Sequence, residues 1–188
     1  ENFVECGRLG EGAFGEVIQA KDMRTGESVA LKKIFVPNAQ HGLPITIWRE
    51  VKAMTVCDHP NIITVYETFA HGSTLVIVME HMVDSLSSCI QRAQERFSED
   101  VIKYFMQGLL HGLAYLHSLN IIHRDVKPAN ILLSFDGAVK LGDFGLARLT
   151  ASPSRTMSHQ AATRWYRSPE CLYSSRSYGG EVDVWAAG

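Results

Sequence analysis

Four polar side chains in two short stretches have the types and spacing for phosphate and metal chemistry. The stretch HRDVKPAN carries an acid, Asp125, a cation two residues later, Lys127, and a carboxamide, Asn130. Thirteen residues after Asn130 comes a second acid, Asp143, in the triplet DFG. Mg²⁺ prefers oxygen ligands and often shares its coordination with substrate phosphates. Asn130 and Asp143 are therefore predicted metal ligands, and Asp125 is predicted to accept a proton from a hydroxyl.

A glycine-rich turn near the start of the chain has the composition to hold a triphosphate. It reads GEGAFGEV, with Gly10, Gly12 and Gly15 allowing close backbone approach and Val17 placed to lie over a base. This spacing also occurs in dinucleotide-binding folds, but there the third glycine opens a helix, whereas a strand pattern follows here. An ordinary glycine-rich hairpin turn is the alternative.

A lysine in an apolar strand, Lys32, needs an anionic partner. It ends the run VALK, and a lysine is costly to desolvate there unless it meets a fixed charge. Residues 44–57 predict a helix, with proline in the first turn and apolar residues at helical spacing. Glu50 on that helix is the candidate partner, and a solvated helix glutamate is the alternative.

The elements that must position these groups follow from hydrophobic patterning. Residues 3–35 predict three antiparallel strands, and the apolar runs 63–68 and 74–79 complete a five-stranded sheet. A capping serine, Ser98, and two acids begin the clearest helix, whose wide apolar stripe predicts the core of a second lobe. Asn120 is predicted to end that helix. Short strands are expected at 131–133 and 139–141.

Composition limits the classes of function. The chain has 188 residues, of which 46% are apolar and 20% charged, as in ordinary globular domains. A net charge of −2 argues against nucleic acid or an anionic membrane as the main partner. The four cysteines lack metal or disulfide spacing and are expected to be reduced thiols. We therefore expect a cytoplasmic or nuclear protein, or one found in both compartments.

Taken together and in order, these motifs resemble those of a eukaryotic protein kinase. The segment ATRWYRSPE at 162–170 is similar to the ATRWYRAPE segment of the group that holds the cyclin-dependent, MAP, GSK and CDC-like kinases, with Ser168 in place of alanine. PITIWRE at 44–50 falls where cyclin-dependent kinases have their PSTAIRE helix. The chain most resembles the cyclin-dependent kinase family, and within it the cell-cycle-related kinase branch.

This resemblance implies an α+β, bilobal protein-kinase fold. Residues 1–82 would form an N-lobe with a five-stranded antiparallel sheet, one helix and the hinge, and residues 83–188 a mainly helical C-lobe with the catalytic loop and the activation segment. Kinase domains normally continue for roughly another hundred residues, so we expect the C-lobe to be incomplete.

The resemblance also implies a serine/threonine kinase that uses ATP and Mg²⁺ and prefers Ser/Thr-Pro sites in protein substrates. Lys32, held by Glu50, would orient the α- and β-phosphates, and Lys127 would neutralise the moving phosphoryl group. Ala162 and Arg167 would shape the pocket for the substrate proline. The residues expected to bind ATP are Leu9, Gly10, Gly12, Gly15, Val17, Ala30, Lys32, Met79, Glu80, Met82 and Leu132.

Regulation is also implied by the resemblance. Ser158 stands at the place of the single activating threonine of cyclin-dependent kinases, and Arg49, Arg124 and Arg148 stand where the family gathers its phosphate-binding arginines. We expect an upstream kinase to phosphorylate Ser158 and a cyclin-type protein to bind the PITIWRE helix. Gln160 argues against dual Thr/Tyr activation. The alternatives are an inactive kinase-like fragment or scaffold, and a MAP-kinase-like enzyme with atypical activation.

Overall fold

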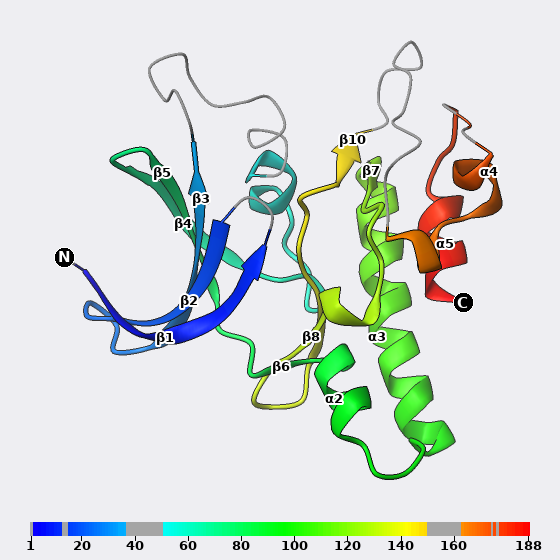
Figure 1. Cartoon of the computed structure of the whole chain (residues 1–188), viewed down its shortest axis with the longest axis horizontal. Coiled ribbons are helices and arrows are strands. Elements are labelled where there is room, and N and C mark those ends of the chain that lie inside the picture. The colour runs from blue at the N-terminus through cyan, green and yellow to red at the C-terminus, as the bar shows by residue number, and fades with distance from the viewer. Residues whose placement is uncertain (1, 13–14, 37–50, 150–162, 174, 176) are drawn as a thin grey trace.

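The chain folds into a β-sheet part followed by a mainly helical part, which lie side by side (Figure 1). The structure is a computed structural model, and it describes residues 2–12, 15–36, 51–149, 163–173, 175 and 177–188. This arrangement confirms the predicted bilobal kinase fold. The lobe boundary at 82/83 stays a prediction.

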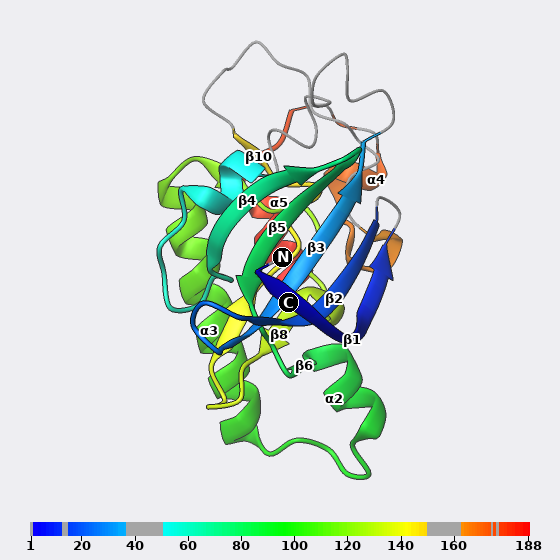
Figure 2. The same cartoon turned by 90° about the vertical axis from the view of Figure 1, so that its left-hand side faces the viewer.

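The first part is one antiparallel sheet of five strands in the order β1-β2-β3-β5-β4, seen face-on in Figure 2. Strand β5, which lies between β3 and β4, is buried from Leu75 to Met79, as expected for a strand paired on both sides. A Cβ at Gly15 would lie 1.8 Å from the Lys33 carbonyl oxygen, so β2 and β3 can approach there only with glycine. The strands are β1 (Phe3–Gly12), β2 (Gly15–Asp22), β3 (Ser28–Phe35), β4 (Val65–His71) and β5 (Thr74–Glu80).

The second part is built on α3 (Glu99–Ser118), the long helix predicted from the apolar stripe. Ser98 caps it by accepting a hydrogen bond from the Val101 N–H, and two acids in the first turn favour the helix dipole. After the helix, Asn120 has a φ of 57°, so the chain turns there as predicted.

Short elements surround α3 and carry the polar stretches of the sequence. In chain order they are β6 (Asp84–Ser85), α2 (Leu86–Arg92), β7 (Ile121–Ile122), the 3₁₀ helix η2 (Pro128–Asn130), β8 (Ile131–Leu133), β9 (Val139–Leu141), β10 (Arg148–Leu149), the 3₁₀ helix η3 (Arg164–Tyr166), α4 (Pro169–Leu172) and α5 (Glu181–Ala187). Among the described residues, no helix is long and apolar enough to cross a membrane. All four cysteines are free thiols.

The two parts share one hydrophobic core. Residues of the sheet, such as Ile77, belong to the same buried cluster as Leu113 and Leu116 of α3. At the junction, the Asn61 side chain donates to the Val139 carbonyl oxygen and the Asn61 carbonyl oxygen accepts from the Leu141 N–H, at 2.8 and 2.9 Å. These contacts fix the segment before β4 against β9, and thus the sheet against the strand that leads to DFG.

Candidate active site

The carboxylate of Asp125 lies at the centre of a hydrogen-bond network in the loop between β7 and η2. Lys127 Nζ donates to Oδ2 at 2.7 Å, and Asn130 Nδ2 donates to the same oxygen at 3.0 Å. Thr163 donates to Oδ1 through both its N–H and its hydroxyl, at 3.1 and 3.0 Å. Lys127 Nζ also donates to the Thr163 hydroxyl at 3.0 Å. The predicted proton acceptor and the predicted phosphoryl-binding lysine are therefore in direct contact.

The predicted metal ligands have oxygens suited to a hard cation. Asn130 uses its amide nitrogen on Asp125, so its amide oxygen is the atom with the chemistry to bind a metal. Asp143 contributes a carboxylate at a φ of 55°, with Lys32 Nζ 3.0 Å from its Oδ1. No group of three or more His, Cys, Asp or Glu side chains able to hold a metal occurs within the described ranges. This donor set fits Mg²⁺, which usually takes one or two protein carboxylates plus phosphate and water.

Lys32 keeps Asp143 ionised. Burial raises the pKa of Asp143, but the charge and hydrogen bond of Lys32, with smaller contributions from His123 and the Gly145 N–H, lower it more, and the net pKa lies below the ordinary value of 3.8. Because the pKa of Asp143 is lower in the folded protein than in the unfolded chain, its ionised carboxylate stabilises the fold. This contribution to folding stability is present above pH 3.8 and is lost as the pH falls through the lowered pKa. At neutral pH, Asp143 is thus a carboxylate ready for a cation.

Replacing Lys32 by Met should raise the pKa of Asp143, since the largest remaining influence is burial. An NMR titration of the Asp143 carboxyl carbon between about pH 3 and 6 measures this shift. Lys33→Met is the matched control, because Lys33 is the next residue of β3 and its Nζ pairs with Glu5 of β1 instead. An unchanged Asp143 titration in Lys32→Met would show that the contact has no electrostatic effect.

His123 joins the HRDVKPAN stretch to the DFG triplet. Its Nδ1 accepts from the Asp125 N–H at 3.3 Å, so Nε2 carries the hydrogen and donates to the Gly142 carbonyl oxygen at 2.9 Å. Its ring packs edge-on against Phe144, with ring centroids 5.1 Å apart. This fully buried imidazole thus connects the backbone at Asp125 with the residue before Asp143.

Asp183 anchors the same stretch from α5. Its carboxylate accepts from the backbone N–H groups of His123 and Arg124, at 2.9 and 2.7 Å, and contacts His117 Nε2 at 2.9 Å. The side chain is fully buried. Asp183 thus ties the HRDVKPAN stretch to α5 through two backbone N–H groups.

Most residues predicted to bind the nucleotide base come together between the sheet and β8. Ala30, Met79 and Met82 belong to the main buried cluster, and Val17 and Leu132 pack against it. Leu9, in β1, is 46% exposed and lies outside that cluster. Gly10 and Gly12 lie in β1, and Gly15 begins β2 directly opposite Gly12. Their contact with a nucleotide stays a prediction.

The predicted regulatory residues are only partly described. Glu50, Arg49, Ser158 and Ala162 lie outside the described residues, as does the PITIWRE segment at 44–50. The helix predicted over 44–57 is described only in part, and there residues 51–55 are helical.

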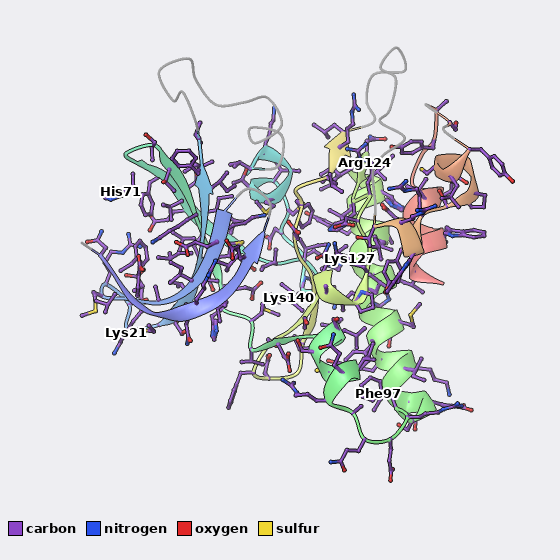
Figure 3. The ribbon with its side chains drawn as sticks, in the orientation of Figure 1. Lys21, His71, Phe97, Arg124, Lys127 and Lys140 are labelled. Carbon is purple, nitrogen blue, oxygen red and sulfur yellow. The ribbon has the colours of Figure 1, made fainter. Side chains whose placement is uncertain are left out.

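Two of the three predicted phosphate-binding arginines, Arg124 and Arg148, lie on neighbouring segments. Arg124 is labelled in Figure 3. Arg148 in β10 pairs with Ile122 of β7, two residues before Arg124. Arg124 Nε donates to the Leu146 carbonyl oxygen at 2.7 Å, and its Nη1 donates to the Tyr178 hydroxyl at 3.1 Å. Arg167 is half-buried directly after η3.

Two site residues were not predicted from the sequence. Thr163 contacts both Asp125 and Lys127. Its place in the ATRWYRSPE segment was the feature of the sequence that could have indicated this role. Gly142 precedes DFG, and a Cβ there would lie 2.7 Å from Leu132 Cδ1. Glycine thus lets Leu132 pack against the start of the DFG triplet, a need that spacing alone did not reveal.

Residues 3–188 of this chain match the protein kinase domain family. The chain belongs to the protein kinase family. Cyclin-dependent kinase 20 from Danio rerio is 45% identical over 190 residues, and the same-named human protein is 44% identical. Each alignment covers 100% of this chain and 55% of the relative. Cyclin-dependent kinase D-1 from Arabidopsis thaliana is 43% identical over 180 residues, 96% of this chain and 45% of that protein.

These matches confirm the predicted cyclin-dependent kinase family. The chain spans about half the length of the curated relatives it matches.

Proposed function

We propose that this chain carries the nucleotide site and catalytic residues of a protein kinase that transfers the γ-phosphate of ATP to serine or threonine in proteins. The observation that carries the proposal is the joint placement of Lys32, Asp125 and Asp143. They come from β3, from the loop after β7 and from the loop after β9, and His123 joins the last two loops. The family membership supports ATP and Mg²⁺ as cofactors.

Each of the five site residues has a distinct part in the proposed reaction. Bound Mg²⁺ would supply positive charge to the phosphates, and Asn130 and Asp143 are the residues to hold it. Lys32 supplies a positive charge beside Asp143 for the α- and β-phosphates. Asp125 accepts the proton of the substrate hydroxyl. Lys127, whose Nζ lies 2.7 Å from Asp125 Oδ2, stabilises charge on the transferred group. Such positioning and charge neutralisation carry most of the catalysis in phosphoryl transfer.

For the substrate, we propose serine or threonine followed by proline. The proposal rests on Ala162 and Arg167, which match the positions that shape this pocket in the resembling group. Proline has no N–H to leave unpaired, so a pocket without an acceptor there can select it. The names of the relatives support a cyclin-type partner, for which the segment 44–50 is the proposed contact.

Transfer of radiolabelled γ-phosphate to a Ser-Pro peptide tests this function, with a Ser-Ala peptide as control. The full-length protein is assayed with and without a cyclin-type partner. We expect transfer to the Ser-Pro peptide that rises with the partner and is lost in Asp125→Asn. ATP binding without transfer under any of these conditions would instead support a kinase-like scaffold.

We also propose activation by phosphorylation of Ser158. A phosphate there would bring about two negative charges and three strong acceptors to Arg124 and Arg148, which lie on neighbouring segments. Ser158→Ala should lower the activity of the full-length protein with its partner by about 5- to 150-fold. Ser154→Ala, in the same segment, serves as the control and should keep full activity. Full activity of Ser158→Ala would refute this regulation.

A further inference from the structure

A salt bridge joins the end of the sheet to the strand that leads to DFG. Lys140 Nζ lies 2.7 Å from Oε1 and 2.8 Å from Oε2 of Glu80. Both side chains are largely buried, with 14% of Lys140 and 16% of Glu80 exposed. Oε1 of Glu80 also accepts from the Thr64 N–H at 2.6 Å, and the Glu80 N–H donates to the Thr64 carbonyl oxygen at 3.1 Å. We call Glu80 and Lys140 the hinge ion pair.

The hinge ion pair connects three segments at the junction of the two parts, where Figure 3 labels Lys140. Glu80 ends β5 and begins the predicted hinge, residues 80–82, and Thr64 directly precedes β4. Lys140 lies in β9, opposite Leu132 of β8 and three residues before Asp143. Through this one ion pair, Glu80 is linked to β9, which pairs with Leu132 and leads to the predicted metal ligand Asp143.

The geometry indicates a role in positioning more than in stability. Removing two charges from water costs free energy that their attraction only partly repays, so a buried pair is often no more stabilising than apolar residues of the same size. The two contacts of Lys140 with one carboxylate do, however, restrict rotation of the hinge relative to β9. On the other side of the hinge, the Val83 N–H donates to the Leu133 carbonyl oxygen at 2.9 Å, which fixes β8 to the same segment.

We propose that Glu80 and Lys140 are positioning residues that hold the hinge against β9 and so keep the nucleotide site preformed. This inference rests on the proposed function. A site that is correctly arranged for only a fraction of the time binds its ligand more weakly by that fraction. Loss of the hinge ion pair therefore weakens ATP binding, while the groups that carry out the transfer, Asp125 and Lys127, keep their own contacts.

The test uses Lys140→Met, Glu80→Gln and the double variant in the full-length protein. A fluorescent ATP analogue with Mg²⁺ gives the Kd, and steady-state assays give KM for ATP and kcat. We expect Kd and KM to rise about 5- to 50-fold in each single variant, with kcat within about threefold of wild type. Because both changes remove the same contact, the double variant should resemble each single variant rather than show the product of the two effects.

The control pair is Lys33 and Glu5, whose Nζ–Oε1 contact of 2.6 Å lies in the same sheet outside the predicted nucleotide site. Lys33→Met should leave Kd and KM unchanged, and circular dichroism must show that every variant is folded at the assay temperature. Unchanged or tighter ATP binding in Lys140→Met and Glu80→Gln, with wild type binding normally, would overturn the positioning role. Failure of wild type itself to bind ATP would instead refute the proposed function.

Discussion

Replacing Asp125 by Asn is expected to lower the turnover number by about two to four orders of magnitude. Asparagine has nearly the same size but only one acceptor oxygen, so it can accept from Lys127 or from Thr163 but not from both. Its amide cannot take a proton from the substrate hydroxyl. The ATP dissociation constant should change by less than about threefold, because the predicted base and phosphate contacts lie elsewhere.

Single-turnover and steady-state phosphotransfer assays on the full-length protein measure this effect. The matched control is Asp100→Asn, an acid in the first turn of α3 whose side chain is 95% exposed. It should keep the wild-type turnover number. A turnover number for Asp125→Asn equal to wild type would remove Asp125 from its assigned role.

The second large effect is expected for Asp183→Asn, which should lower the free energy of unfolding by about 3–5 kcal/mol. Asp183 is fully buried and accepts from two backbone N–H groups and from His117. Asparagine has only one acceptor oxygen, so its NH₂ group must face a donor. The loop of His123 and Arg124 then loses its anchor, and activity falls together with stability.

Urea unfolding gives the free energy, and hydrogen exchange at the amides of His123 and Arg124 shows where the loss occurs. Val184→Ala is the control in the same helix, because Val184 is 54% exposed and should change stability by about 0.5 kcal/mol or less. Wild-type exchange rates at both amides in Asp183→Asn would contradict the anchoring role.

Local patterns were sufficient to predict most of the fold. Strands β1, β2 and β3 lie within the predicted 3–35 region, and β8 and β9 have the predicted bounds. The apolar stripe after Ser98 became α3, with Leu109, Leu113 and Leu116 buried. These features depend on residues close in sequence, where periodicity reports directly on burial.

Contacts between distant residues were harder to predict. Lys32 was correctly expected to need an anion, but the contact described is with Asp143, 111 residues away, while the predicted partner Glu50 lies outside the described residues. Glu80 and Lys140 are 60 residues apart, and each lies in a strand whose pattern gives no sign of a partner. Such pairs follow from how strands cross at the junction, which no local pattern specifies.

The roles of the site residues stay predictions until a nucleotide is bound. A crystal structure of the full-length protein with Mg²⁺ and a non-hydrolysable ATP analogue tests the central claim most directly. We predict the adenine against the backbone of residues 80–82, Lys32 on the α- and β-phosphates, and Mg²⁺ on Asn130 and Asp143. A nucleotide bound at another surface, or a metal held by neither Asn130 nor Asp143, would contradict the account.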